Sequence, residues 1–237
     1  MLGRVQRVAG DPRVNPVANR ETISDAPSAG FVALAGLWCA ALSANLLRFV
    51  WLGYDALRRD MPPAINKKDL ERSLTQLLAP RIRRVMSGDE PFDFEHGPYE
   101  RETMKPPPAQ PPQYDLAFVL RADERVMWPL EAKKLETDGA VADYVDDVRN
   151  QFLRCRYAPF SSEGAMLGYL LSGSPAIVFK NISAKVPCSL EDHPAFPNRP
   201  HKFSRHRRQV AAGKSHPREF RYHHLILEFP ELRPHGT

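Results

Sequence analysis

Cysteine is scarce in this sequence, which has only Cys39, Cys155 and Cys188 among its 237 residues. The three lie far apart, and none belongs to a C-x-x-C pair or to a paired Cys/His spacing. An odd, scattered set of this kind fits neither a disulfide framework nor a cysteine-based zinc site. It suits a reducing compartment, so we expect a cytoplasmic protein in which the cysteines are small core residues.

Several catalytic signatures are also missing. The chain contains no G-x-x-x-x-G-K-[ST] and no G-x-G-x-x-G, which disfavours nucleotide hydrolysis and dinucleotide binding. It has no G-x-S-x-G nucleophile elbow either. No internal repeat is evident, so we do not expect a repeat architecture.

Charge is absent from residues 26–47, APSAGFVALAGLWCAALSANLL. This length is enough to cross a bilayer, but Ser43 and Asn45 interrupt the segment and it continues into the amphipathic sequence RFVWLGYDALRRD. A buried or amphipathic N-terminal helix is the favoured interpretation, and a membrane anchor is the alternative. Acidic residues precede the segment where a signal peptide carries basic ones, which argues against a signal peptide.

The remaining composition is that of an ordinary globular protein, with 43% hydrophobic and 26% charged residues. Lys and Arg number 33 against 28 Asp and Glu, which gives a net charge of +5. This is a modest bias toward polyanionic partners and is not sufficient to establish one. Residues 1–28 are polar and show no pattern, which predicts a flexible leader. The remaining length suits a helical extension over 29–62 and one domain over 63–237.

Hydrophobic periodicity predicts an α/β fold with a mixed central sheet and helices on its faces. Strand-forming runs joined by the hairpin-length loop RADE favour two antiparallel neighbours. The expected elements are a helix over 66–86, strands over 114–120 and 126–135, a helix over 140–156, a strand over 165–173, a helix from Ser174 and a strand over 220–229.

One of these strands carries WPLEAKKL, which places Glu131 and Lys133 together on the face opposite Trp128. Asp115 begins the preceding strand, so a hairpin brings it within a few ångströms of this pair. Two carboxylates and an ammonium form a site for a divalent cation and a bound water. The alternative is a solvated sheet edge with an ordinary salt bridge.

Asp115 followed by Glu131-Ala132-Lys133 resembles the motif of the PD-(D/E)XK nucleases, the restriction-endonuclease-like superfamily. The resemblance covers about residues 66–173, where the expected order is helix, strands, helix, strand. It implies that Asp115 and Glu131 bind Mg²⁺, for which Mn²⁺ can substitute, and that Lys133 assists the attacking water. The sequence departs from the family pattern in having no proline directly before Asp115.

The same resemblance suggests further site residues on the helices. Glu71 stands where members of the superfamily often place an additional metal ligand, and Glu95 is a weaker rival. Gln151 and Arg154, one turn apart on the helix after the motif, are placed to contact the scissile phosphate or the water. Glu71, Gln151 and Arg154 have a plain alternative as exposed polar side chains on their helices.

Residues 198–224 concentrate basic side chains and five histidines, with only Glu219 opposing them. Such clusters bind phosphate backbones, so we expect a DNA-facing basic loop, with a merely solvated segment as the alternative. Its S-x-H-x-R element resembles one in uncharacterised bacterial nuclease-like proteins. The histidine spacing matches no zinc motif, and His223-His224 suits a structural role. The nucleic-acid-binding candidates here are Ser204, Arg205, His206, Arg207 and Arg208.

The sequence therefore predicts a Mg²⁺-dependent deoxyribonuclease, with bacterial defence or DNA processing suggested by analogy. Two alternatives stay open: a catalytically inactive nucleic-acid-binding module of the same fold, and a protein anchored in a membrane through residues 26–47. DNA is the expected partner, although the residues do not separate DNA from RNA. Cleavage of both strands would favour a homodimer.

Overall fold

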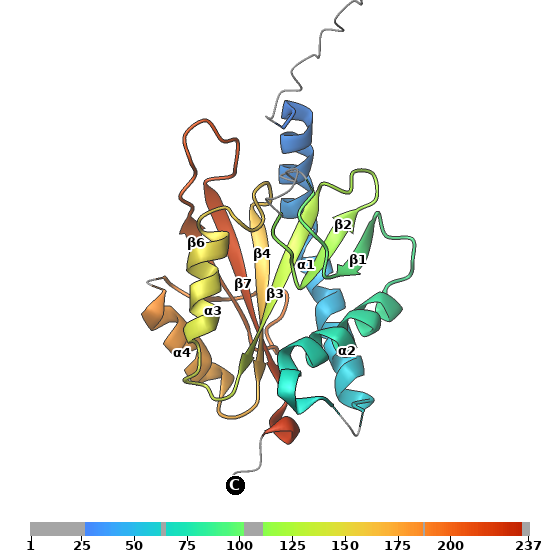
Figure 1. Ribbon diagram of the computed structural model, residues 1–237, viewed down its shortest axis with the longest axis vertical. Coiled ribbons are helices and arrows are strands. Elements are labelled where there is room, and N and C mark those ends of the chain that lie inside the picture. The colour runs from blue at the N-terminus through green and yellow to red at the C-terminus, as the bar shows by residue number, and fades with distance from the viewer. Residues whose placement is uncertain (1–26, 63–64, 102–110, 187, 234–237) are drawn as a thin grey trace, which may run out of the picture.

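The computed structural model describes residues 27–62, 65–101, 111–186 and 188–233. The leader expected over 1–28 lies outside these residues, apart from its last two positions. Within the described ranges the chain forms a mixed seven-stranded sheet with helices packed against both faces, which confirms the α/β class (Figure 1).

The sheet has the strand order β1-β2-β3-β4-β7-β6-β5. Its first three strands form an antiparallel meander, β3 and β4 are parallel, β4 and β7 are parallel, and β6 is antiparallel to β7. The predicted hairpin between β2 and β3 is confirmed, with Leu116 opposite Leu130. The strands are β1 (Phe92–His96), β2 (Leu116–Leu120), β3 (Met127–Leu135), β4 (Glu163–Leu170), β5 (Glu191–Asp192), β6 (His201–Arg207) and β7 (Glu219–Glu228).

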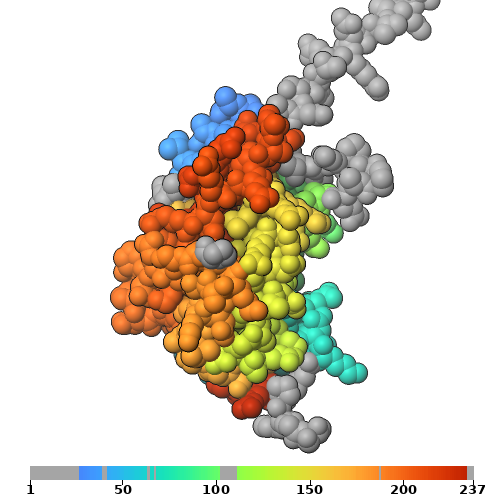
Figure 2. Space-filling model, turned by 90° about the vertical axis from the view of Figure 1, so that its left-hand side faces the viewer, coloured from blue at the N-terminus to red at the C-terminus, as the bar shows by residue number. Residues whose placement is uncertain are grey.

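Side-chain alternation along β3 divides the core between the two faces of the sheet. Trp128, Leu130 and Ala132 point into a large cluster that includes residues of α1 (Ala29–Arg59) and α2 (Leu70–Val85). Leu135, in step with Glu131 and Lys133, points instead into the cluster formed with α3 (Ala142–Asp147) and α4 (Pro175–Lys185). Figure 2 shows α3 and α4, in yellow and orange, covering that side of the molecule.

The predicted N-terminal helix is present as α1, and Ser28 caps it by accepting a hydrogen bond of 3.2 Å from the amide of Phe31. Leu46, Leu47 and Val50 are fully buried in the core that α1 shares with the sheet, whereas Leu34 and Leu37 are exposed, so the helix is amphipathic over this segment.

In the part of the chain that the structure describes, no single helix is long and apolar enough to cross a membrane. One pair of segments, Ala29–Trp38 and Leu42–Arg59, bent by 54° at its break, meets the length and composition criteria together.

The helix expected over 140–156 is shorter and less regular than its periodicity suggested. α3 ends at Asp147 and continues as one π-helical turn, Val148–Phe152. Cys155 and Ala158 then adopt positive φ angles of 57° and 50°, which no right-handed helix allows. The helix-like spacing of apolar residues extends beyond α3 because the π-helical turn and the residues after it also bury hydrophobic side chains against the sheet.

Candidate functional site

Asp115 and Glu131 lie side by side across the β2–β3 hairpin, as predicted. The backbone amide of Asp115 donates a hydrogen bond of 3.0 Å to Oε1 of Glu131. Oδ2 of Asp115 accepts one of 2.8 Å from the amide of Ala132. Among the described residues, the second oxygen of each carboxylate has no hydrogen-bond donor, which leaves both oxygens available to a cation.

Lys133 and Glu71 complete the predicted group. Nζ of Lys133 lies 3.7 Å from Oε1 of Glu71, so α2 does bring this acid to the motif. Oε2 of Glu71 accepts a hydrogen bond of 2.7 Å from the amide of Lys134, which ties the first turn of α2 to β3. The weaker candidate Glu95 is bound instead to Arg101, at 2.8 Å.

Asp147 is a member of the site that sequence reasoning missed. Its Oδ2 lies 3.0 Å from Nζ of Lys133, at the point where α3 becomes the π-helical turn. The only sequence signal was its position beside the apolar face of α3. Contact with β3 depends on how the helix returns over the sheet, which the local pattern does not specify.

Two carboxylates, those of Glu71 and Asp147, therefore contact the Lys133 ammonium, and the linked carboxylates of Asp115 and Glu131 lie beside this group. Burial, together with the nearby charge of Asp115, raises the pKa of Glu131 well above its usual range, and burial raises the pKa of Glu71. Burial alone would lower the pKa of Lys133, but its hydrogen bond with Asp147 and the surrounding acids raise it. Lys133 therefore stays protonated around neutral pH, and the group contains more acids than bases.

The group is more open than a closed metal cage. Among the described residues, the only three potential ligands whose donor atoms all lie within 4.8 Å of one another are histidines elsewhere in the sheet. The acids at β2 and β3 converge less tightly because Lys133 occupies the space between Glu71 and Asp147. A cleft of about 370 Å³ opens beside them, lined by Glu71 and Asp115 together with Arg72, His96 and Gln113.

Gln151 and Arg154 lie on the segment that follows α3. Gln151 is in the π-helical turn, and its buried Oε1 has no hydrogen-bond partner among the described residues. Its main-chain oxygen accepts hydrogen bonds of 2.9 Å from the amides of Arg156 and Tyr157. Arg154 is exposed. No contact joins either side chain to the acidic group within the described ranges, so their catalytic and phosphate-binding roles stay predictions.

The basic segment differs from the expected DNA-facing loop, because residues 201–207 form strand β6 in the sheet. Ser204 is fully buried, and its hydroxyl lies 2.7 Å from Nε2 of His206 and 2.8 Å from Nε2 of His224. Arg208 is also buried, and its guanidinium donates to main-chain oxygens. Phosphate contact by Ser204 or Arg208 would therefore require breaking internal structure. The oxygens that Arg208 contacts belong to Phe152, Tyr157, Ala158 and Ser161.

Arg205 and Arg207 keep the exposure that a phosphate contact requires. Arg205 pairs with Glu191 of β5 at 2.7 Å, and both side chains are well exposed. His206 is half-buried, and burial lowers its pKa. The loop that follows β6 stands out at one end of the molecule (Figure 1). The surface available to nucleic acid is thus smaller than the sequence suggested.

Comparison of the chain with protein-family models, with curated proteins and with solved structures finds no match.

Proposed function

We propose that this protein is a metal-dependent deoxyribonuclease of the PD-(D/E)XK type. The observation that carries the proposal is an acidic group beside an open cleft: Glu71 and Asp147 contact Lys133, and Asp115 is linked to Glu131 next to them. Structural ion pairs tend toward neutrality, whereas this half-buried group holds more acids than bases. Such an imbalance is relieved by a divalent cation.

The fold supports the proposal through its topology. The order α2, β1, β2, β3, α3, β4 gives a helix, an antiparallel meander, a second helix and a strand parallel to β3. This is the order that the resemblance to the restriction-endonuclease-like superfamily implied. Asp115 directly precedes β2. Glu131 and Lys133 lie in β3, which pairs with β2 on one side and with β4 on the other.

The residues fit a Mg²⁺ ion, since carboxylate oxygens are its preferred protein ligands. Asp115 and Glu131 would hold it, with Glu71 as a further ligand. When bound, the ion supplies an activated water and neutralises charge at the phosphate. Lys133 is protonated and cannot remove a proton from water, so its role is to stabilise the negative charge that develops on the phosphate.

A catalytically inactive nucleic-acid-binding module of the same fold is the second candidate. It is favoured by the ion pairs of Lys133, which engage the ammonium with Asp147 at 3.0 Å and with Glu71 at 3.7 Å. Catalysis requires that these contacts loosen when a metal ion and a phosphate bind. The two candidates share DNA as partner and differ only in turnover.

A plasmid-nicking assay with and without Mg²⁺ separates the two. The nuclease converts supercoiled DNA to the nicked form only with Mg²⁺ or Mn²⁺, and Glu131→Gln abolishes this conversion while DNA retention persists. Glu136→Gln is the matched control, because Glu136 is exposed and pairs with Lys134 on the opposite face. DNA retention without metal-dependent nicking by the parent protein would establish the inactive module. Linear product from a dimeric form would support cleavage of both strands by a homodimer.

Beyond the reaction, we propose the cytoplasm as the compartment, from the cysteine usage, and defence or DNA processing as the setting, by analogy with the superfamily.

A further inference from the structure

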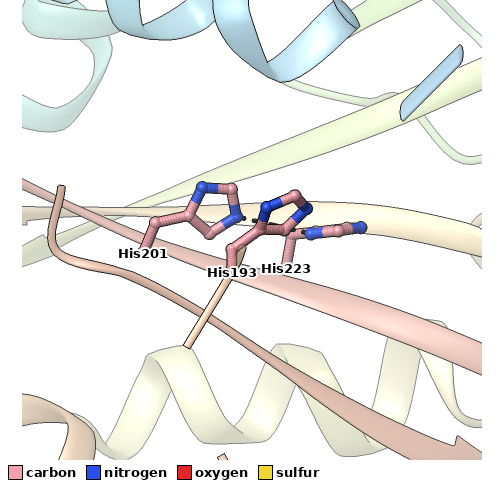
Figure 3. Close-up of side chains that lie close together, drawn as sticks. All are labelled: His193, His201 and His223. Carbon is pink, nitrogen blue, oxygen red and sulfur yellow. Dashed lines mark hydrogen bonds between the residues drawn. The ribbon is translucent and has the colours of Figure 1, made fainter. Parts of the chain in front are cut away.

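Three histidines from separate parts of the C-terminal half meet inside the protein (Figure 3). His193 follows β5, His201 begins β6, and His223 lies in β7. All three are buried, with exposed fractions of 7%, 1% and 0%. One nitrogen from each ring lies within 4.8 Å of the corresponding nitrogens of the other two.

The spacing of these rings matches that of imidazoles around one tetrahedral ion. Zinc binds histidine nitrogen at about 2.0–2.1 Å, which places two such nitrogens about 3.3–3.4 Å apart. Nε2 of His201 and Nδ1 of His223 are 3.3 Å apart. The same geometry puts ring centres about 5 Å apart, and the three observed separations are 4.7, 5.3 and 5.5 Å.

The surroundings supply the outer contact that zinc-binding histidines commonly have. Nε2 of His223 lies 3.2 Å from Oε2 of the buried Glu163, so a His223 that binds metal through Nδ1 donates its other N–H to a carboxylate. Arg221 holds the second oxygen of Glu163 at 2.9 Å. Glu163 also lines a surface hollow of about 210 Å³, which brings solvent to within one side chain of the cluster.

From this geometry we propose that His193, His201 and His223 bind one zinc ion, separate from the acidic site on β2 and β3. Three imidazoles leave one coordination position for a water molecule. Neutral imidazole is a ligand for zinc and its neighbours in the first transition row, and is a poor ligand for Mg²⁺. The ion ties the β5–β6 connection to β6 and β7.

Without metal, the same groups form a directed chain of hydrogen bonds. Nε1 of Trp51 donates to Nδ1 of His201 at 3.3 Å, which leaves His201 to donate through Nε2 to His223, and His223 to donate to Glu163. Zinc replaces the proton between the two rings. With zinc on Nε2, the proton of His201 is on Nδ1, where it faces the indole N–H of Trp51. Trp51 must therefore shift, and the fluorescence of Trp51 reports zinc binding.

The test titrates Zn²⁺ into the full-length chain after chelator treatment and dialysis. We expect one zinc per chain by elemental analysis, a higher Tm and a change in tryptophan fluorescence, whereas Mg²⁺ should leave the fluorescence unchanged. His223→Gln should weaken zinc binding about 100-fold or more, and Glu163→Gln about 10–100-fold. The absence of stoichiometric zinc in the parent protein would overturn the site and leave a hydrogen-bond chain only.

Two variants locate the ion. His224→Gln is the matched control, because His224 is equally buried in β7 but bonds to Ser204 and Tyr144 rather than to the cluster, so it should keep its zinc. Glu131→Gln should keep it as well, which separates this site from the proposed nuclease site. Equal zinc binding by His223→Gln and the parent protein would place the ion elsewhere and refute the assignment.

Discussion

The main chain of Asp115 holds the side chain of Glu131, since the Asp115 amide donates to Oε1 of Glu131 at 3.0 Å. In return, the side chain of Asp115 is held by the main chain next to Glu131, because the amide of Ala132 donates to Oδ2 of Asp115 at 2.8 Å. Each carboxylate is therefore oriented by the strand that carries the other. Two acids fixed in this way are preorganised for a cation, because no rotamer has to be frozen when it binds.

Glu131→Gln should make the metal-free protein more stable at neutral pH while it abolishes nicking. Burial raises the pKa of Glu131 in the folded state, so folding favours its protonated form. The stability that Glu131 contributes is therefore complete below its pKa in the unfolded chain. It is lost as the pH rises from that pKa through the higher pKa of the folded state. Glutamine keeps a hydrogen-bond acceptor for Asp115 without that charge.

Thermal unfolding from pH 4 to pH 8 in chelator checks this expectation. The Tm advantage of Glu131→Gln should grow with pH, by about 2–4 °C for each kcal/mol gained. Added Mg²⁺ should narrow the difference, because it stabilises only the parent protein. A Tm that is lower than that of the parent at every pH would show that the ionised carboxylate is structurally required.

Lys133→Ala should slow nicking by about 100-fold or more at saturating Mg²⁺, the usual scale for losing a positioned charge-stabilising group. Metal and DNA binding should persist, since both carboxylate ligands and most of the basic charge remain. Lys134→Ala is the control, because Lys134 pairs with Glu136 on the other face of the strand. This substitution should change the nicking rate little. Equal nicking rates for Lys133→Ala and the parent would remove Lys133 from the mechanism.

Asp147→Asn should introduce a loss of nicking at high pH that the parent protein, whose Lys133 stays protonated there, does not show. The hydrogen bond with Asp147 is the main contact that raises the pKa of Lys133, so its loss lets the ammonium deprotonate earlier. Rates measured across the alkaline range test this, with Asp146→Asn as a control whose side chain bonds to Asn150. An unshifted profile would mean that Asp147 does not act through Lys133.

Arg208→Ala should destabilise the fold by about 2–4 kcal/mol, because it leaves buried carbonyls without their charged donor. Burial lowers the pKa of Arg208 to about 10, and the guanidinium binds the turn after the π-helix. Urea unfolding measures the destabilisation. Arg207→Ala, at an exposed position on the same segment, should stay within about 0.5 kcal/mol of the parent. Similar destabilisation by both variants would contradict the anchoring role.

The double variant Arg205→Ala/Arg207→Ala should weaken DNA binding for all sequences and flatten its dependence on salt. Removing one phosphate interaction reduces the slope of log K against log salt by about 0.9. Binding curves at several salt concentrations measure the slope. A slope equal to that of the parent would assign β6 a purely structural role, in keeping with the buried positions of Ser204 and Arg208.

The part of the site predicted from the sequence is the part set by local pattern. Alternation in WPLEAKKL determined the shared face of Glu131 and Lys133, and a short loop determined the antiparallel partner that carries Asp115. Helical periodicity located α2 with Glu71 in its first turn. These properties depend on neighbours within a few tens of residues, which explains their success.

The missed features depend on contacts between distant segments. The sequence of β6 is typical of a basic loop, because most of its residues are Lys, Arg or His. In the structure, however, Phe203 and Ser204 are buried. Arg208 is matched only by carbonyls that the π-helical turn and the residues after it present. His193, His201 and His223 match no ligand spacing in the sequence, so their proximity becomes visible only through the β5–β6 and β6–β7 pairings.

The docking of α1 has a consequence for how the chain folds during synthesis. Trp51 contacts His201 across 150 positions, and Tyr54 bonds to Glu228 across 174. The central strand pair β4 and β7 also joins residues far apart in the chain. α2 and β1 can cover part of α1 early, but the part that carries Trp51 and Tyr54 is covered only when the last strands have emerged. Contacts of such long range slow folding, so the interval before they form is when this protein most needs a chaperone.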